Sequence, residues 1–490
     1  MGYALLIVGL GLVLLICVLF FRTLRLTSMQ MRVDQAGEIA FDGQAAAARL
    51  AAALRFETIS SEDLTQVPAE ALISLHRHLE KSYPRVHNKL SKELVGNYSL
   101  LYTWEGPEEG LNPILLLAHM DVVPVEPKTA GDWTYAPFDG EIAEGFVWGR
   151  GSMDDKVAVT GILEAAELLL SEGFQPQRTI YLAFGHDEEI GGLRGAALIG
   201  DLLRSRGVEP GLVLDEGLLI AQGVVPKVPK PVALVGIAEK GYVSVELTVK
   251  GAGGHSSMPP QETPVGILST AIHKLEKNHF PARLDGPVKK MFDFIAPEMP
   301  FGMKMVFANL WLFGGLVENR LAASPATNAA IRTTTAATIF EGGAKENVLP
   351  AQARAVVNFR ILPGGSIASV IDHVRGIIDD SRVQLKSVGR FTSEPSPISD
   401  LDSPSFQVLQ RTIHQVFPDV LVAPGLVLGA TDSRHYSGLS RNVYRFSPLR
   451  ARPEDLERVH GTNERVSVED YGQIVKFYVQ LMRNSASQVG

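Results

Sequence analysis

The chain has 490 residues, of which 46% are hydrophobic and 20% charged. At roughly 100–200 residues per domain, this length predicts two or three domains, and the apolar content excludes wholesale disorder. The formal net charge of −8 argues against a nucleic-acid-binding surface. The single cysteine, Cys17, excludes a disulfide framework and cysteine-ligated zinc, so any metal must be bound by His, Asp and Glu.

The N-terminal run, residues 1–21, contains no Asp, Glu, Lys or Arg and is long enough to cross a bilayer as a helix. It lacks the preceding positive charge of a secretion signal, and no convincing cleavage site follows it. We therefore predict a single-pass membrane anchor and a juxtamembrane linker over 22–43. A cleaved signal, and hence a secreted protein, is the alternative. Arg22, Arg25 and Arg32 favour a cytoplasmic body, but a long domain can override that bias, so the side of the membrane stays open.

Residues 44–241 have the pattern of the first part of an α/β domain. Residues 44–55 are rich in Ala and Leu and predict a helix, and 155–171 have helical spacing of apolar residues. Three short, wholly apolar runs predict buried strands of a mostly parallel sheet covered by helices on both faces. These runs are Ile114–Ala118, Thr179–Phe184 and Leu212–Leu214.

From residue 242 the pattern changes, and 242–392 predict a second, inserted domain. Alternating strands and helices follow in the order β-α-β-β-α-β, which is the ferredoxin-like order. Residues 393–485 then return to the first domain and end in an amphipathic helix over 468–483. Inside the insert, residues 287–316 are rich in Met and Phe. They could form buried core or an oligomer contact, an apolar wall for a substrate, or a face resting on lipid.

Acidic and histidine side chains follow each of the three predicted strands. Because ligands bind at the carboxyl ends of strands in open α/β sheets, this placement is informative. The clusters are His119-Met120-Asp121, His186-Asp187-Glu188-Glu189 and Asp215-Glu216, and two more are Asp154-Asp155 at a helix start and His460 to Glu464 late in the chain. Alone, each could be a surface pair, a solvated loop or a helix cap. Together they supply nitrogen and oxygen ligands that suit a paired zinc, manganese or cobalt site used for hydrolysis.

These motifs, in this order, resemble the aminoacylase-1/carboxypeptidase S family of di-metal peptidases over residues 50 to 485. The motifs that carry the resemblance are H-M-D, G-R-G-S-M-D-D-K, D-E-E-I-G-G, L-D-E-G and V-H-G-T-N-E. The Met- and Phe-rich insert is most similar to the branch that contains carboxypeptidase S and the N-fatty-acyl-amino-acid synthase/hydrolases. The resemblance implies a zinc-peptidase-like catalytic domain, with 242–392 as a ferredoxin-like lid and dimerisation domain.

The resemblance also implies two zinc ions per subunit, with cobalt or manganese as alternatives. His119 and Asp215 would bind one ion, Glu189 and His460 the other, and Asp154 both. Relatives differ over whether the residue at 215 or the one at 216 is the ligand, and spacing favours Asp215 over Glu216. Glu188 would be the general base that activates water, and Asp121 would orient His119.

The remaining roles implied by the resemblance concern substrate and partner. Arg434 would bind the free carboxylate of the substrate, and Asn347 would contact it. His255 would reach the partner's active site in a homodimer and stabilise the oxyanion. The expected function is hydrolysis of a peptide or N-acyl amide bond beside a free carboxylate. The alternatives are an aminopeptidase, against which Arg434 argues, and a membrane-tethered scaffold on a retired hydrolase fold, which would lack ligands.

Overall fold

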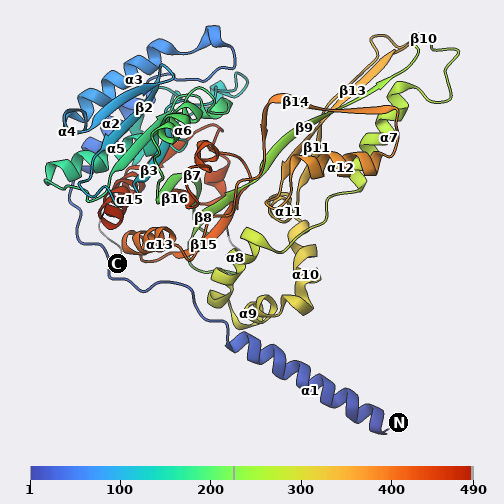
Figure 1. Ribbon diagram of the computed structural model, residues 1–490, viewed down its shortest axis with the longest axis horizontal. Coiled ribbons are helices and arrows are strands. Elements are labelled where there is room, and N and C mark those ends of the chain that lie inside the picture. The colour runs from blue at the N-terminus through green and yellow to red at the C-terminus, as the bar shows by residue number, and fades with distance from the viewer. Residues whose placement is uncertain (1, 225–226, 487–490) are drawn as a thin grey trace.

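The computed structural model describes residues 2–224 and 227–486, and it shows two domains and one projecting helix (Figure 1). The helix is α1 (Gly2–Leu24), which matches the predicted apolar segment and extends away from both domains. It is long and apolar enough to span a membrane, a test that a signal sequence also passes. The linker after it runs along the larger domain: the Gln30 side-chain amide donates to Val422 O at 3.0 Å, and Gln410 donates to Met29 O.

The larger domain is built on an eight-stranded sheet of order β1-β2-β6-β3-β7-β16-β8-β15. Its central strands β6, β3, β7 and β16 are parallel, as predicted; β1 and β2 add antiparallel strands at one edge, while β8 and β15 run antiparallel to β16 at the other. The strands are β1 (Ser91–Val95), β2 (Ser99–Trp104), β3 (Ile114–His119), β6 (Ile180–Gly185), β7 (Leu212–Ala221), β8 (Val232–Glu239), β15 (Leu421–Val427) and β16 (Val443–Ala451).

Helices cover both faces of this sheet because its central strands are apolar at successive positions. In β3, Leu116 and Ala118 pack into the core on one face, while Leu115 and Leu117 belong to the core on the other. On the first face lie α2 (Gly43–Leu54), α3 (Ala69–Ser82), α4 (Pro84–Lys89), α5 (Lys156–Ser171), α13 (Pro404–Val416) and α15 (Val468–Ala486). On the second lies α6 (Ala196–Ser205). The predicted α/β class is confirmed.

The smaller domain, the lid, is a four-stranded antiparallel sheet of order β11-β13-β9-β14. With its two packed helices it has the predicted β-α-β-β-α-β order of elements. These are β9 (Gly241–Lys250), α7 (Pro264–Lys277), β11 (Thr334–Gly342), β13 (Gln352–Ile361), α12 (Ile367–Ile378) and β14 (Val383–Ser393). Two short strands, β10 (Gly254–His255) and β12 (Val348–Leu349), form the outer tip of the lid (Figure 1).

Four further helices lie between α7 and β11 and were not predicted individually. They are α8 (Gly286–Ile295), α9 (Phe301–Ala308), α10 (Leu310–Ala322) and α11 (Pro325–Ile331), and they contain the Met- and Phe-rich segment. Helix α8 packs beside β15 at the edge of the large sheet, and α9 packs beside α1 (Figure 1). A small three-stranded sheet, β4 (Glu141–Ala143), β5 (Phe146–Trp148) and β17 (Arg465–Ser467), and the short helix α14 (Pro453–Leu456) complete the larger domain.

Candidate active site

The predicted cluster residues meet at the carboxyl edge of the large sheet. His119 is the last residue of β3, Glu188 and Glu189 follow β6, and Glu216 lies within β7. Because β3, β6 and β7 are parallel neighbours, their carboxyl ends point to the same side of the sheet. The small sheet adds the remaining groups: Asp154 lies in the loop after β5, and His460 lies in the loop before β17.

Asp154 lies between the two histidines, with one carboxylate oxygen directed at each. Its Oδ1 is 3.0 Å from Nε2 of His119, and its Oδ2 is 3.0 Å from Nε2 of His460. Glu189 Oε2 approaches the same His460 nitrogen to 3.3 Å. Two groups of side chains with metal-ligand geometry result, and they share Asp154: His119, Asp154 and Glu216, and Asp154, Glu189 and His460.

Glu216, rather than Asp215, lies beside His119. Glu216 Oε1 is 3.5 Å from His119 Nε2. The Asp215 carboxylate instead accepts the backbone N–H of Glu216 at 2.9 Å and that of Ser433 at 2.7 Å. The group around His119 therefore contains Glu216 and not the expected Asp215, whose role as a ligand stays a prediction. Asp215 Oδ2 is occupied by the Ser433 N–H of the neighbouring 432–436 turn, and Oδ1 is occupied by the backbone N–H of the next residue.

Asp121 lies where it can orient the His119 ring. Its backbone oxygen is 3.0 Å from His119 Nδ1, and its carboxylate Oδ1 is 3.4 Å away. The same carboxylate accepts the backbone N–H groups of Glu188 and Glu189, each at 3.1 Å. Asp121 thus connects the cluster after β3 to the cluster after β6. A buried partner on the second ring nitrogen fixes the tautomer that leaves Nε2 free as a ligand.

A buried Arg150–Glu464 pair supports the Asp154 loop, and sequence reasoning assigned neither residue a role. Arg150 Nη1 lies 2.6 Å from Glu464 Oε2, and Glu464 Oε1 accepts the backbone N–H of Gly151, Met153 and Asp154. Both side chains are almost completely buried. The pair joins two predicted motifs that are about three hundred residues apart, and their only sequence signal was a charged residue inside each motif.

The carboxylates at this edge lie close enough to repel one another, and the pKa values of several groups there are raised. Burial, reinforced by the charge of Asp154, raises the pKa of Glu216 to about 8. Burial also raises the pKa of Glu188 well above its usual range; His119 opposes the rise, and Asp432 and Glu216 add to it. Hydrogen bonds that the His460 ring donates to the carboxylates of Asp154 and Glu189 raise the pKa of His460 to about 10. Such crowding is the environment that a divalent cation relieves.

The donor set fits a pair of divalent metal ions. It consists of two imidazoles and three carboxylates, a combination of nitrogen and oxygen ligands that suits zinc, manganese or cobalt. Oε1 of Glu189 is buried and has no hydrogen-bond partner within the described chain, which leaves a lone pair for a ligand bond. A scaffold on a retired hydrolase fold would lack some of these groups, whereas here they converge.

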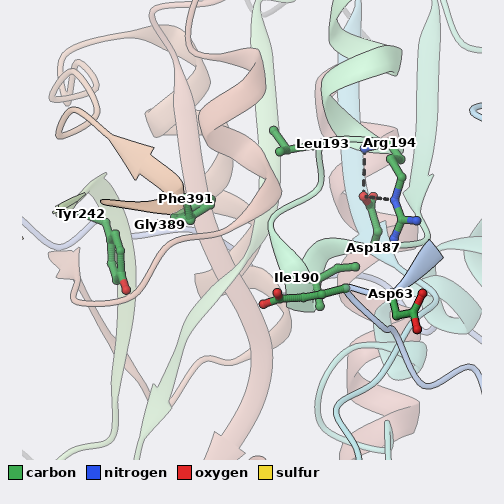
Figure 2. Close-up of a pocket in the computed structure, with 9 residues that line it drawn as sticks. Asp63, Asp187, Ile190, Leu193, Arg194, Tyr242, Gly389 and Phe391 are labelled. Carbon is green, nitrogen blue, oxygen red and sulfur yellow. Dashed lines mark hydrogen bonds and ion pairs between the residues drawn. The ribbon is translucent and has the colours of Figure 1, made fainter. Parts of the chain in front are cut away.

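A cleft of about 1070 Å³ opens between the two domains beside this cluster (Figure 2). Ile190 and Leu193 from the loop after β6 line one wall, and Tyr242 and Phe391 from the lid line the other. The adjoining pocket contains Arg434, whose guanidinium carbon lies 4.2 Å from the centre of the Phe391 ring. The predicted carboxylate-binding residue thus borders the cleft, next to the loop that carries Glu188 and Glu189.

His255 and Asn347 lie together, but at the tip of the lid and not at the metal-binding edge. His255 pairs with Val348 across β10 and β12, and Asn347 O accepts the N–H of Ser256 at 3.2 Å. Both residues are exposed, and the tip lies far from the carboxyl ends of β3, β6 and β7 (Figure 1). Within one chain, the structure therefore does not bring these two predicted site residues to the others.

Paired histidines and carboxylates beside a cleft are the donor groups of a metal-dependent hydrolase. The family model of Peptidase family M20/M25/M40 matches residues 115–484, and the chain belongs to this family. The chain is 43% identical to "Probable carboxypeptidase S-like 2" of Dictyostelium discoideum over 482 residues, 96% of this chain and 92% of that protein. It is 42% identical to the "N-fatty-acyl-amino acid synthase/hydrolase" of Xenopus tropicalis over 484 residues, 97% of this chain and 93% of that protein.

Comparison with solved structures agrees with this family assignment. The structure of an M20 family metallo-carboxypeptidase from Sulfolobus solfataricus superimposes with a TM-score of 0.66 at 18% identity, covering 90% of this chain and 99% of that one. The predicted resemblance, fold class and enzymatic reaction class are confirmed.

Proposed function

We propose that this enzyme hydrolyses N-acyl amino acids with a long acyl chain, using two zinc ions held at the carboxyl edge of the large sheet. The observation that carries the proposal is the Asp154 carboxylate, which directs one oxygen at His119 and the other at His460, each at 3.0 Å. A shared carboxylate between two sets of nitrogen and oxygen donors is the arrangement that places two ions side by side. Glu216 completes the set around His119, and Glu189 completes the set around His460.

When bound, the two ions acidify a water molecule and polarise the carbonyl of the scissile amide. The chain's own residues do the rest. Glu188 is the general base: its raised pKa lets the carboxylate accept a proton from water and then pass it to the leaving amine near neutral pH. Asp121 is a positioning residue, because it holds the His119 ring and the backbone of Glu188.

Substrate recognition is assigned to the cleft. Arg434 binds the free carboxylate, a task that suits the two-pronged guanidinium group. The side chains of Ile190, Leu193 and Phe391 offer an apolar wall for the acyl chain. A relative named as an N-fatty-acyl-amino acid synthase/hydrolase supports this substrate class, and one named as carboxypeptidase S-like supports a peptide with a free carboxyl end.

The lid tip acts on a second subunit in this proposal. His255 and Asn347 are exposed and far from their own chain's metal-binding edge, so they contribute only if the tip of one subunit enters the cleft of its partner in a homodimer. There the His255 imidazole donates a hydrogen bond to the developing oxyanion. Helix α1 anchors each subunit in a membrane.

The test compares two substrates on the full-length protein in detergent, loaded with zinc. A long-chain N-acyl amino acid should be turned over with a kcat/KM at least about tenfold higher than a blocked dipeptide with a free carboxyl end, a difference of about 1.4 kcal/mol. The reverse preference would make the enzyme a carboxypeptidase. A preference for a free amino end with no need for the carboxylate would identify an aminopeptidase and remove the role of Arg434.

A further inference from the structure

Helices α9 and α10 expose large apolar side chains to solvent beside the end of α1. Phe301 is 46% exposed, Trp311 57%, Leu312 45% and Leu316 66%. We call the surface that these four side chains form the α9–α10 surface. Patches of large apolar side chains next to one another are uncommon on monomers and mark a surface that contacts something else.

The α9–α10 surface is continuous with the membrane-length helix. The Phe20 and Phe301 rings lie 5.5 Å apart, and Arg22 Nε donates to Ala308 O at 3.2 Å. Helix α1 itself is apolar and exposed within the structure, with no part of its most apolar window buried against protein. The last turns of α1 therefore bring α9 to the level at which a spanning helix leaves the bilayer.

Buried polar contacts fix this junction. Asn309, between α9 and α10, is completely buried, and its side-chain amide lies 3.2 Å from Leu19 O and 2.9 Å from Met305 O. Thr23, at the end of α1, is also completely buried. Removing α1 would expose or orphan these groups, so the contact belongs to the intact chain rather than to a chain without its first helix.

The opposite face of the same helices is already used for packing. Val317 of α10 packs in a cluster with Val288, Phe292 and Ile331, and α8 packs beside β15. The first two turns of α10 thus expose Trp311, Leu312 and Leu316 away from this packed cluster, and the polar residues of the helix, Glu318 to Arg320, follow in its later turns. Large apolar side chains exposed at the start of a helix that is already packed on another face indicate a second apolar contact.

The flanking residues have the chemistry of a membrane interface. The Trp311 indole N–H donates to Asn309 Oδ1 at 3.2 Å while most of the ring faces outward. Tryptophan is enriched at the headgroup level of membranes because its ring is apolar and its N–H is polar. Arg22 lies in the last turn of α1, Arg25 lies directly after that helix, and Lys304 lies in α9; all three suit anionic headgroups.

We propose that the α9–α10 surface rests in the headgroup region of the bilayer that α1 crosses, so that its partner is a lipid surface. The proposal rests on the membrane anchor of the proposed function and not on its chemistry. Helices α9 and α10 lie between α7 and β11 of the lid, so this contact ties the lid to the membrane. An enzyme held this way takes amphiphilic substrates from the bilayer surface.

The test measures quenching of tryptophan fluorescence by lipids brominated on the upper part of the acyl chain. The full-length protein is reconstituted into bilayers of phosphatidylcholine and phosphatidylglycerol. Trp104, Trp133 and Trp148 are buried in the larger domain, so the emission difference between wild type and Trp311→Phe reports Trp311 alone. Brominated lipid should remove most of that difference, and bromine near the chain terminus should remove less.

Three results decide the proposal. Quenching of Trp311 by brominated lipid supports it. Quenching by aqueous iodide but not by brominated lipid would overturn it and place the surface in water. Protection from both quenchers would also overturn it and identify a second copy of the chain as the cover. Replacing Leu312 and Leu316 by Glu should reduce the lipid quenching, whereas Leu94→Glu and Ile142→Glu, at exposed sites in the larger domain, should not.

Turnover of a soluble N-acetyl amino acid, measured on the same samples, separates this proposal from the proposed function. Retained turnover without lipid quenching refutes the membrane contact alone. Lipid quenching without any turnover by the wild-type protein refutes the hydrolase assignment and leaves the membrane contact in place.

Discussion

The metal-binding edge of the large sheet and the tip of the lid differ in how firmly their side chains are held. At the edge, Asp121 accepts two backbone N–H groups and Glu464 accepts three. At the tip, His255 lies on a two-residue strand, is exposed, and contacts Ser257 through its ring nitrogen at 2.8 Å. The edge is assembled within one chain, whereas the tip takes part in catalysis only in the homodimer that we propose.

The largest expected effect is that of Glu188→Gln at the edge. The substitution removes the general base without changing the size of the side chain, so kcat should fall by about 10³–10⁴-fold. Both metal ions should remain bound, because Glu188 is in neither ligand group. Steady-state kinetics and elemental analysis check this, and activity above about a tenth of wild type would remove Glu188 from its role.

The lid tip is tested by His255→Ala, which should lower kcat by about 10²–10³-fold by removing one donor to the oxyanion. The melting temperature should not change, because the side chain is exposed. Mixing this variant with Glu188→Gln under subunit exchange should restore activity, since a mixed dimer contains one intact cleft with an intact tip opposite it. No recovery in confirmed mixed dimers would contradict action between subunits.

A third comparison separates two neighbouring carboxylates at the edge. Glu216→Gln should lower the affinity for one metal ion. The loss should exceed the roughly 10–100-fold that is typical when a residue outside the ligand shell is changed. Asp215→Asn is the matched control: it should keep both ions and instead loosen the 432–436 turn, raising KM through Arg434. Metal content of both variants after dialysis checks this, and loss of metal only from Asp215→Asn would restore Asp215 as the ligand.

A smaller effect is expected from pH on the metal-free edge. Glu216, with a pKa near 8, and His460, with a pKa near 10, hold protons more tightly in the folded chain than in the unfolded one. Their contribution to the free energy of unfolding is therefore lost as pH rises through these values. The melting temperature of chelator-treated protein should fall between about pH 6.5 and pH 8, and bound metal should abolish the fall. A melting temperature that rises over this pH range in the metal-free protein would contradict the conclusion that negative charges are crowded at this edge.

Much of this site could be predicted because it follows short apolar strands. Strand β3 up to Ala118, strand β6 and the first three residues of β7 are apolar, and the polar residues that follow these runs mark the edge of the sheet where the site lies. The choice between Asp215 and Glu216 could not be made this way, because the pairing of β7 with β16 shifts register directly after Asp215. Which of two adjacent side chains faces the site then depends on tertiary structure.

Other features lay beyond local patterns. Glu464 and Arg150 are far apart in the chain, so neither motif shows that they form a buried pair. The edge strands β8 and β15 and the contact of α9 with α1 likewise depend on long-range packing. The position of His255 away from its own metal-binding edge follows from the length of β9 and β13, which carry the tip outward (Figure 1).

The most direct test of the two-ion site is a zinc titration of the chelator-treated, full-length enzyme, followed by calorimetry and by turnover of an N-acyl amino acid. The shared Asp154 carboxylate predicts two ions per chain, full activity only when both are bound, and loss of both high-affinity sites in Asp154→Asn. A single ion per chain, or full turnover after complete removal of metal, would contradict the account.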